Sequence, residues 1–418
     1  MTTDSLARVS NIALRGLTLT SKFALVFFLA KLLAPDQLGL FGLLAATIGF
    51  ALYVLGFEFY SYSTREIIGS APQRRLGFIR DQAAFHVVAY VVSLPLLLLV
   101  FWRGWLPWSY LPWLLALLVL EHTAQELNRI LVAVSQPLVA SIVLFLRSGA
   151  WCWLAIAAMW HVPSTRSIHF VLALWTVGVA TACALAIDRV LRFDRAALAE
   201  SINWRWIATG LKVAAPLLLA SLSIRAIFTI DRYWVESIAG LGTLGAYVLF
   251  VGMASAVLSF LDAGVIDFIY PRLVIAAKAG DDETFRKGMA TLRRQVLAAT
   301  GSLCLACWML SEPLLNWLDK PIYLEHLYVL KWLLLAVSIY AVGLIPHIGL
   351  YAHGRDRALV LSQLAGFAVF LAVAIVGDHA QGLMNVATAL CLAFSVMLAW
   401  KFVAYRSLQQ GRASAVPA

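Results

Sequence analysis

Charged side chains within long apolar stretches are the residues of this sequence best placed to do chemistry. In the first apolar stretch, Arg15 and Lys22 lie seven residues apart, which places them roughly 10 Å apart on one side of an α-helix. Each cation costs on the order of 2.5–3.5 kcal/mol at the centre of a membrane helix. Because this stretch carries no acid of its own, either acids on other helices or an anionic ligand must compensate the two charges.

A stripe of polar side chains in the fourth apolar stretch is the second candidate site. It consists of Glu121, His122, Gln125, Glu126, Asn128 and Arg129, which cover an arc of about 160° on a helix. After the turn at Gln136-Pro137, the next helix is expected to bring Arg147 back to a depth near Glu126 or Arg129. One interpretation is a buried Arg–Glu network, since arginine suits bidentate pairing inside proteins. The other is a cavity wall in which Glu121 or Glu126 binds a proton or a sodium ion.

The second half of the chain repeats the theme of the first helix with an acid added. Arg225 and Arg232 are also seven residues apart within an apolar stretch, and Asp231 lies between them. Asp231 therefore joins Glu121 and Glu126 as a candidate site for a coupling ion.

Motifs for enzymatic or metal chemistry are missing from the sequence. It contains no DxD motif, no nucleophile–base pair at a usable spacing and no phosphate-binding glycine loop. Cys304 and Cys307 form a CxxC pair, but they lie inside an apolar stretch with no second Cys/His pair nearby, which favours a packing role. We expect no catalytic residue, no metal and no cofactor.

The composition indicates that these charges lie in a membrane protein. Of 418 residues, 62% are hydrophobic and 13% are charged, and the mean hydropathy is +0.85. Soluble chains carry about 45–50% apolar and roughly 25% charged residues. The net charge of +10 falls in the gaps between apolar runs, where it sets topology and meets anionic headgroups. We therefore expect membrane lipids, and no nucleic acid, as partners.

The apolar runs predict an all-α polytopic protein with about twelve transmembrane helices. A membrane-spanning helix needs about 20 mostly apolar residues, and the runs lie near 9–33, 38–60, 81–102, 111–133, 138–160, 168–187, 207–230, 240–262, 291–311, 328–351, 358–376 and 383–403. Arginine and lysine are concentrated in alternate loops, such as 65–80, 189–205 and 272–294. The positive-inside rule then predicts that both termini are cytoplasmic.

The two halves of the chain resemble each other. Leu38-Gly39 at the start of the second helix matches Leu244-Gly245 at the start of the eighth, and each helix runs into a basic loop. Six helices per half is an even number, so the repeats are predicted to be parallel, related by an axis along the membrane normal. We predict two six-helix transmembrane bundles, 1–198 and 199–418.

These features together resemble the polysaccharide flippases of the MOP superfamily, the Wzx-like relatives of the lipid II flippases and MATE exporters. The resemblance lies in the two parallel halves, in the cations of the first helix and in the segment 30–41, AKLLAPDQLGLF, which is similar to the first outside turn of that family. The segment from Glu121 to Gly149 also looks like members of this group.

The resemblance implies a multi-pass transporter of the bacterial plasma (inner) membrane. It would flip a polyprenyl-pyrophosphate-linked oligosaccharide to the outer leaflet by alternating access, for O-antigen, capsule or exopolysaccharide biosynthesis. Polysaccharide polymerases or export proteins would be its partners. The anion cavity would be lined by Arg15, Lys22, Arg129, Arg147 and Arg225, and Glu121, Glu126 and Asp231 would couple transport to protons or sodium ions.

Two alternatives stay open at this stage. A MATE-like small-molecule exporter shares the architecture, but it predicts an acidic cavity for cationic drugs, whereas the first and seventh helices here are basic. An embedded polysaccharide polymerase or ligase would carry a large outside loop, whereas the longest outside loop of this chain, 312–327, is short.

Overall fold

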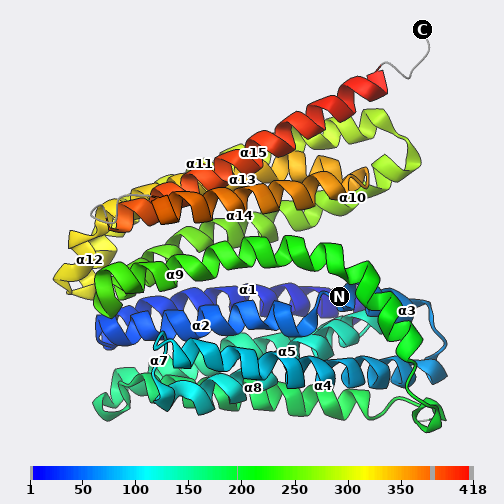
Figure 1. Cartoon of the computed structure of the whole chain (residues 1–418), viewed down its shortest axis with the longest axis horizontal. Helices are drawn as coiled ribbons and strands as arrows, with labels where there is room; N and C mark the ends of the chain where they lie inside the picture. The colour runs from blue at the N-terminus through cyan, green and yellow to red at the C-terminus, as the bar shows by residue number, and fades with distance from the viewer. Residues whose placement is uncertain (1–2, 195, 377–381, 414–418) are drawn as a thin grey trace. The chain divides into compact units, whose positions relative to one another are not determined.

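The fold is described from a computed structural model that covers residues 3–194, 196–376 and 382–413. Throughout these residues the regular structure is helical (Figure 1). The chain folds into two compact units, Met1–Leu222 and Ser223–Ala418.

The helices of the first unit are α1 (Thr3–Leu32), α2 (Pro35–Gly56), α3 (Tyr60–Gly69), α4 (Pro72–Trp102), η1 (Trp108–Tyr110), α5 (Leu111–Ala133), α6 (Pro137–Phe145), η2 (Leu146–Ala150), α7 (Trp151–His161), η3 (Pro163–Thr165), α8 (Ile168–Val190), η4 (Ala196–Ala199) and the first part of α9 (Trp204–Leu261). The second unit contains the rest of α9, η5 (Asp262–Ile266), α10 (Asp267–Ala279), α11 (Asp282–Leu318), α12 (Pro321–Glu325), α13 (Leu327–Ala352), α14 (Asp356–Val376) and α15 (Leu383–Ala413).

Proline sets the start of several helices. Pro35, Pro72 and Pro137 each occupy a first helical position of α2, α4 and α6, where the missing N–H costs no hydrogen bond and the fixed φ angle suits the helix. These prolines follow the turns that the sequence indicates at Ala34-Pro35 and Gln136-Pro137.

The number of spanning helices agrees with the prediction of about twelve. Ten segments of the described residues are long and apolar enough to cross a membrane. One of them, Trp204–Ala279, has 76 residues and is interrupted at Gly240, where φ is 76°, so it contains two spans. The 23-residue α5 is long enough to cross as well, but its charged stripe makes it too polar to belong to the ten. The all-α polytopic fold is therefore confirmed, whereas the sidedness of the termini stays a prediction.

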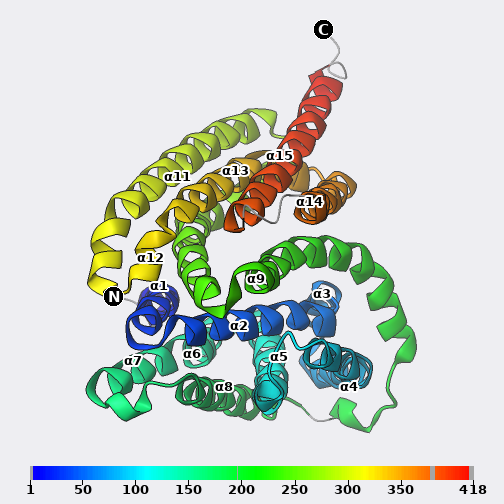
Figure 2. The same ribbon diagram turned by 60° about the vertical axis from the view of Figure 1, so that its left-hand side comes forward.

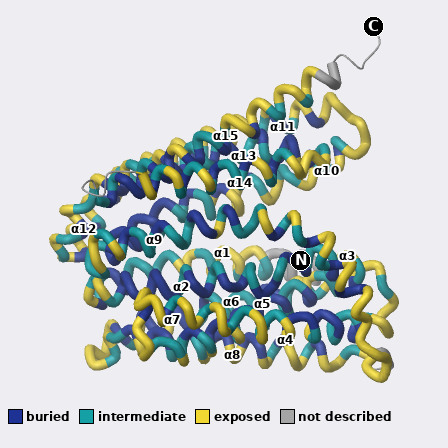
Figure 3. Tube along the Cα trace, in the orientation of Figure 1, coloured by how far each residue is buried: buried dark blue, intermediate teal, exposed yellow. Residues whose placement is uncertain are grey.

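Within the first unit, α5 packs against α2 and α8, and α1 packs against α6, η2 and α7. α2 is buried along most of its length, whereas much of α4 is exposed, as the dark blue and yellow stretches of Figure 3 show. Val87, Val91 and Leu96 are among the exposed apolar residues of α4. Within the second unit, α13 packs against both α11 and α15, and α14 packs against α15.

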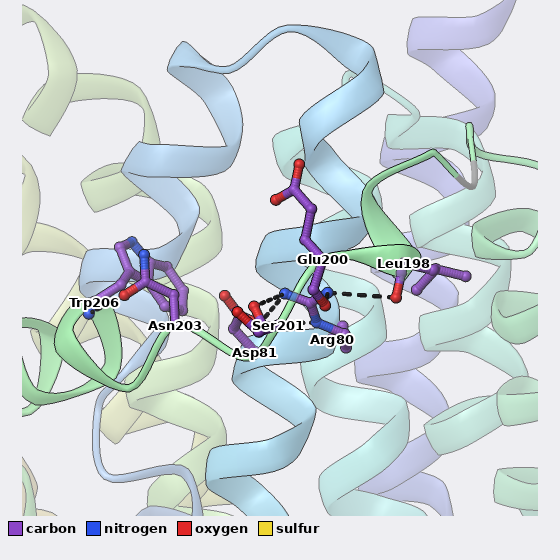
Figure 4. A network of polar contacts seen from close by, with 7 residues as sticks. All are labelled: Arg80, Asp81, Leu198, Glu200, Ser201, Asn203 and Trp206. Atoms are coloured by element: carbon purple, nitrogen blue, oxygen red, sulfur yellow. Dashed lines mark hydrogen bonds and ion pairs between the residues drawn. The ribbon is translucent and has the colours of Figure 1, made fainter.

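The segment between α8 and α9 is held on α4 by Arg80. The guanidinium of Arg80 donates to the backbone carbonyls of Leu198, Glu200 and Ser201 and pairs with Asp81, with Nη2 2.6 Å from Oδ1 (Figure 4). The first turns of α9 then insert Trp206 against Phe59. These contacts explain why the first turns of α9 belong to the first unit, up to Leu222, although the sequence predicts the boundary of the halves near 198.

Candidate functional site

The cations of α1 lie on its exposed side. Arg15 and Lys22 are both exposed, whereas Ser21, Leu25 and Leu29 form the buried side of the same helix. Among the described residues, neither Arg15 nor Lys22 takes part in an ion pair. Within the described residues the helix therefore carries two cations without a direct ion pair, in a span where the membrane disfavours charge.

Lys22 lines a cavity of about 270 Å³ within the first unit. Apolar side chains of α2, among them Phe41 and Leu52, form one wall of the cavity. Glu121 on α5 and Arg147 on η2 also reach it. The structure thus brings together three of the residues that the sequence singled out, namely Lys22, Glu121 and Arg147.

Glu121 and Arg147 form an ion pair at this cavity. The Nε atom of Arg147 lies 2.5 Å from Oε2 of Glu121, and Nη2 of Arg147 donates to Oε1 of Gln125 at 3.1 Å. Trp175 on α8 donates its indole N–H to Oε1 of Glu121 at 2.6 Å. Both carboxylate oxygens of Glu121 therefore have donors, and its charge is compensated within the unit.

Two tryptophans fix this pair in place. The rings of Trp151 and Trp175 stack with centroids 5.7 Å apart, and Trp151 donates its indole N–H to the carbonyl oxygen of Arg147 at 2.9 Å. Gly178 allows Trp151 to lie against α8, since a Cβ atom at this position would lie 2.6 Å from Cδ1 of Trp151. Stacked indoles are large and rigid, so they hold Glu121 and Arg147 in one geometry.

The partners of Arg147 are Glu121 and Gln125. The sequence predicts a depth near Glu126 or Arg129, and Gln125 is the neighbour of Glu126 on α5. Arg147 lies in η2, a π-helical turn between α6 and α7. Such a turn holds one residue more than an α-helical turn, so it changes the direction of the side chain in a way that regular helix geometry does not predict.

Glu126 and Arg129 form a second network in the first unit, with partners on α3 and α4. Nη1 of Arg129 lies 2.5 Å from Oε1 of Glu126, and Gln82 donates to Oε2 of Glu126 at 2.7 Å. The guanidinium of Arg129 also lies over the ring of Tyr60, 3.5 Å from its centroid. Burial and the nearby Glu58 carboxylate raise the pKa of Tyr60 to about 12, so its ring stays uncharged beneath the guanidinium. Arg129 is thus engaged away from the residues that line the cavity of Lys22.

A smaller cavity of about 220 Å³ borders this second network. His86 and Tyr90 of α4 and His122 and Glu126 of α5 line it. Tyr90 Oη and His122 Nδ1 are 2.7 Å apart, whereas the Nε2 atoms of His86 and His122 are buried without a protein partner in the described structure. Buried polar atoms of this kind are normally satisfied by water or an ion.

Three residues near this cavity escaped the sequence analysis. Gln82, His86 and Tyr90 follow one another at four-residue spacing in α4. This polar stripe on one side of an apolar helix could have indicated the site from the sequence. Glu58 had no such signal. It is 7% exposed and lies at the break between α2 and α3, where Phe57 and Glu58 have φ angles of 52° and 54°. Non-glycine residues in this conformation cost free energy and are often found at functional sites.

In the second unit, Asp231 is fully buried and engaged. Tyr247 donates its hydroxyl to Oδ2 of Asp231 at 2.8 Å, and the backbone N–H of Arg232 donates to Oδ1 at 2.7 Å. Asp231 also lines a small cavity of about 20 Å³ among apolar side chains such as Phe228 and Phe394. Arg225, one and a half turns earlier on α9, is exposed. Arg225 therefore belongs to the second unit, whereas the other four predicted cations belong to the first.

Comparison with known proteins gives structural likeness only. No protein-family model and no curated protein sequence matches the chain. Among solved structures, the inward-facing conformation of a multidrug resistance MATE family transporter of the MOP superfamily aligns with a TM-score of 0.77 and 11% identity, covering 99% of each chain. A MOP superfamily transporter from Pyrococcus furiosus Vc1 (DSM3638) aligns with a TM-score of 0.60 and 13% identity, covering 96% of this chain and 93% of that one. A MATE protein in a bent conformation aligns with a TM-score of 0.55 and 14% identity, covering 97% and 96%.

These likenesses span almost the whole length of both chains, so they concern the complete arrangement of helices and not one motif. At identities this low they establish the fold and leave the substrate open. The chain is a multi-pass membrane protein with the fold of the MATE and MOP-superfamily transporters.

Proposed function

We propose that this protein is a flippase that carries a polyprenyl-pyrophosphate-linked oligosaccharide across the bacterial plasma membrane by alternating access. The observation that supports this proposal is the charge of the cavity in the first unit. Lys22 lines it without an ion pair among the described residues, while the acid beside it, Glu121, is neutralised by Arg147. With Lys22 protonated and Glu121 ionised, the three side chains together carry one net positive charge.

A cationic cavity fits the physical demands of this cargo. An ion that crosses bare hydrocarbon faces an idealised cost of order 20 kcal/mol per charge, so a pyrophosphate group cannot cross unaided. Lys22 would replace water around the phosphates through charge-assisted hydrogen bonds. Arg147 would take part through donors that do not face Glu121, and Arg15 lies on the same exposed side of α1. Arg225 would be an anion-binding cation of the second unit by itself, whereas Arg129 would hold Glu126 and Tyr60 together in the first unit.

The comparison with Pyrococcus furiosus offers a parallel. That MOP superfamily transporter is described as having a binding pocket of reverse polarity, which suggests a different function for it. By the same reasoning, a MOP-type fold whose α1 cations form no ion pair among the described residues suits an anionic cargo better than a cationic one.

The energy source would be either the membrane potential or a counter-ion. An inside-negative potential drives anions outward by ~2.3 kcal/mol per charge per 100 mV. The cavity beside Glu126, with the unsatisfied Nε2 atoms of His86 and His122, would be the proton or sodium site of the first unit. Asp231 would be the corresponding candidate in the second unit. A polysaccharide polymerase or an export protein would receive the flipped glycan.

A MATE-like small-molecule exporter is the second candidate function. It is favoured by the likeness to a multidrug resistance MATE family transporter, which aligns over 99% of both chains. In that case Glu121, Glu126 or Asp231 would have to release its present partner in order to meet a cationic drug.

Transport by the reconstituted protein separates the two functions. Liposomes would carry a fluorescent polyprenyl-pyrophosphate oligosaccharide, and its access to an outside quencher would be followed under a voltage and under proton or sodium gradients. We expect rapid equilibration with the wild type and its loss in Arg15→Ala and Lys22→Ala. Lys212→Ala is the matched control, because Lys212 is also an exposed lysine within a span but does not line the cavity.

Two outcomes would count against the flippase. Quenching no faster than in empty liposomes, together with extrusion of a cationic dye by the same preparation, would support the exporter. Equal loss of transport in Lys212→Ala and Lys22→Ala would show that general surface charge, and not the cavity, binds the cargo.

A further inference from the structure

A large groove in the second unit lies apart from the residues discussed so far. It has a volume of about 760 Å³ and is lined by residues of α11, α13 and α15. The ribbons of α11, α13 and α15 are shown in Figure 2. Because α13 packs against both α11 and α15, the groove lies over the end of α13, with the two other helices as its walls.

The floor of the groove is apolar. Phe285 and Met289 of α11 are each 8% exposed and line the groove together with Ile345 and Pro346 of α13. The ring of Phe285 meets that of His353 edge-on at 4.7 Å, which closes the floor at the end of α13. A hydrocarbon chain could lie along these side chains without displacing a polar group.

The rim of the groove is cationic. Arg286 and Arg293 on α11 and Arg406 on α15 line it and are exposed. In the part of the chain that the structure describes, none of the three forms an ion pair. Asp282 is the acid among the lining residues, so the rim carries a net charge of about +2 with histidine neutral. The guanidinium of Arg406 lies over the ring of Phe402, 4.3 Å from its centroid, which holds it above the apolar floor.

The rim borders the exposed apolar surface of the two walls. On α11, Leu297 is 50% exposed and the exposed apolar residues continue to Leu310, whereas Arg293 lies one turn before them. On α15, Val403 is 66% exposed and Arg406 follows one turn later. On each wall, therefore, one arginine, Arg293 or Arg406, stands where the exposed apolar surface ends, and Arg286 lies two turns beyond Arg293. Basic residues in such positions are typical of the interface between hydrocarbon and water.

We propose that this groove binds an anionic glycerophospholipid. The phosphate lies among Arg286, Arg293 and Arg406, near Met289, and one acyl chain follows Ile345 and Phe402 toward the bilayer. Basic pockets between transmembrane helices bind acidic headgroups in this way. A free phosphate would use the rim alone and leave the apolar floor exposed to water, so the combination of both surfaces favours the lipid.

Native mass spectrometry of the purified full-length chain tests this proposal. The probes are phosphatidylglycerol and phosphatidylcholine with identical acyl chains, added to the protein in a neutral detergent. We expect phosphatidylglycerol to bind more tightly, and Arg293→Gln to weaken its binding about fivefold, the equivalent of about 1 kcal/mol per arginine. The double variant Arg286→Gln/Arg293→Gln should weaken it about thirtyfold and leave phosphatidylcholine unchanged.

Arg294→Gln is the matched control. Arg294 is the exposed neighbour of Arg293 on the same helix but does not line the groove, so its replacement should change the affinity less than twofold. Equal effects of the Arg293 and Arg294 variants, or equal binding of the two lipids, would overturn the proposal. Displacement of the lipid by millimolar inorganic phosphate would also overturn it, because a site for phosphate alone would then suffice.

Discussion

Replacement of Glu121 by glutamine tests whether its ion pair with Arg147 holds the first unit together. The side chains of Glu121 and Arg147 are 7% and 12% exposed, and the Nε–Oε2 distance is 2.5 Å. Glutamine keeps the size of the side chain and can still accept the hydrogen bond of Trp175, but it removes the negative charge. Arg147 would then be a nearly buried cation without a counter-ion.

The expected loss of stability is large. Two unit charges at 4 Å interact with about 4 kcal/mol at an effective dielectric constant of 20, and removal of one partner of a buried pair costs about 3–5 kcal/mol. Because about a tenth of each side chain remains exposed, we expect the lower end of this range, about 3 kcal/mol. The double variant Glu121→Gln/Arg147→Gln leaves no buried charge and should recover most of this loss.

Equilibrium unfolding in mixed micelles, followed by tryptophan fluorescence, measures these free energies. Asp188→Asn is the control, because Asp188 and Arg192 form an ion pair at 2.7 Å whose side chains are 50% and 64% exposed. Such a pair contributes about 0–1 kcal/mol. If Glu121→Gln were as stable as Asp188→Asn, or if the double variant were less stable than Glu121→Gln alone, our account of this network would be refuted.

Three further predictions concern other parts of the chain. Asp231→Ala leaves the buried Tyr247 hydroxyl without its acceptor. We expect this variant to lower the free energy of unfolding by about 1–3 kcal/mol, which is more than Tyr247→Phe should lower it. Equal losses in the two variants would contradict this role of Asp231. Gly178→Ala brings a Cβ atom within 2.6 Å of Trp151 and should cost about 1–3 kcal/mol, whereas Gly301→Ala, with nothing within 4 Å, should be neutral or slightly stabilising in the same unfolding assay. Hydrogen bonds from Thr284 lower the pKa of Asp281, the N-cap of α11. The cap therefore stabilises the folded protein at pH values above the usual aspartate pKa of ~3.9. This stabilisation is lost as the pH falls through the lower pKa that Asp281 has in the folded protein. The protection of the Thr284 amide, measured as its exchange rate relative to the intrinsic rate at the same pH, should fall only in that acidic range. An unchanged protection would argue against the cap.

The sequence was sufficient for the fold because bilayer thickness leaves few choices. Long apolar runs separated by prolines and basic loops have no other stable solution than spanning helices. The polar stripe of α5 was also predictable, since six polar residues on one face of an apolar helix need partners. Its pairing with Arg147 follows from the same need, although the sequence does not single out Glu121 as the acid of the pair.

What could not be predicted depends on departures from the regular helix. The π-helical turn at Leu146–Ala150 decides that Arg147 meets Glu121, and nothing in the sequence LRSGA requires such a turn. The left-handed conformation of Phe57 and Glu58 is equally hidden, because neither residue favours it. Both departures are maintained by packing from other helices, so a prediction based on local propensity misses them.

The distribution of charge between buried and exposed positions bears most directly on the cargo. Glu121, Glu126 and Asp231 are 5%, 5% and 0% exposed, and each accepts hydrogen bonds from at least two donors. Arg15 and Lys22, in contrast, are exposed within a span. A buried, paired acid is costly to expose to a cationic drug, because its present donors would be left without acceptors. An exposed cation can receive an anion without such a loss and regains the free energy spent on placing it in the membrane. The net charge of the sequence cannot reveal this asymmetry between acids and cations, since the asymmetry depends on which side of each helix faces a partner. An anionic cargo is the simpler hypothesis because the acids are buried and paired while the cations are exposed.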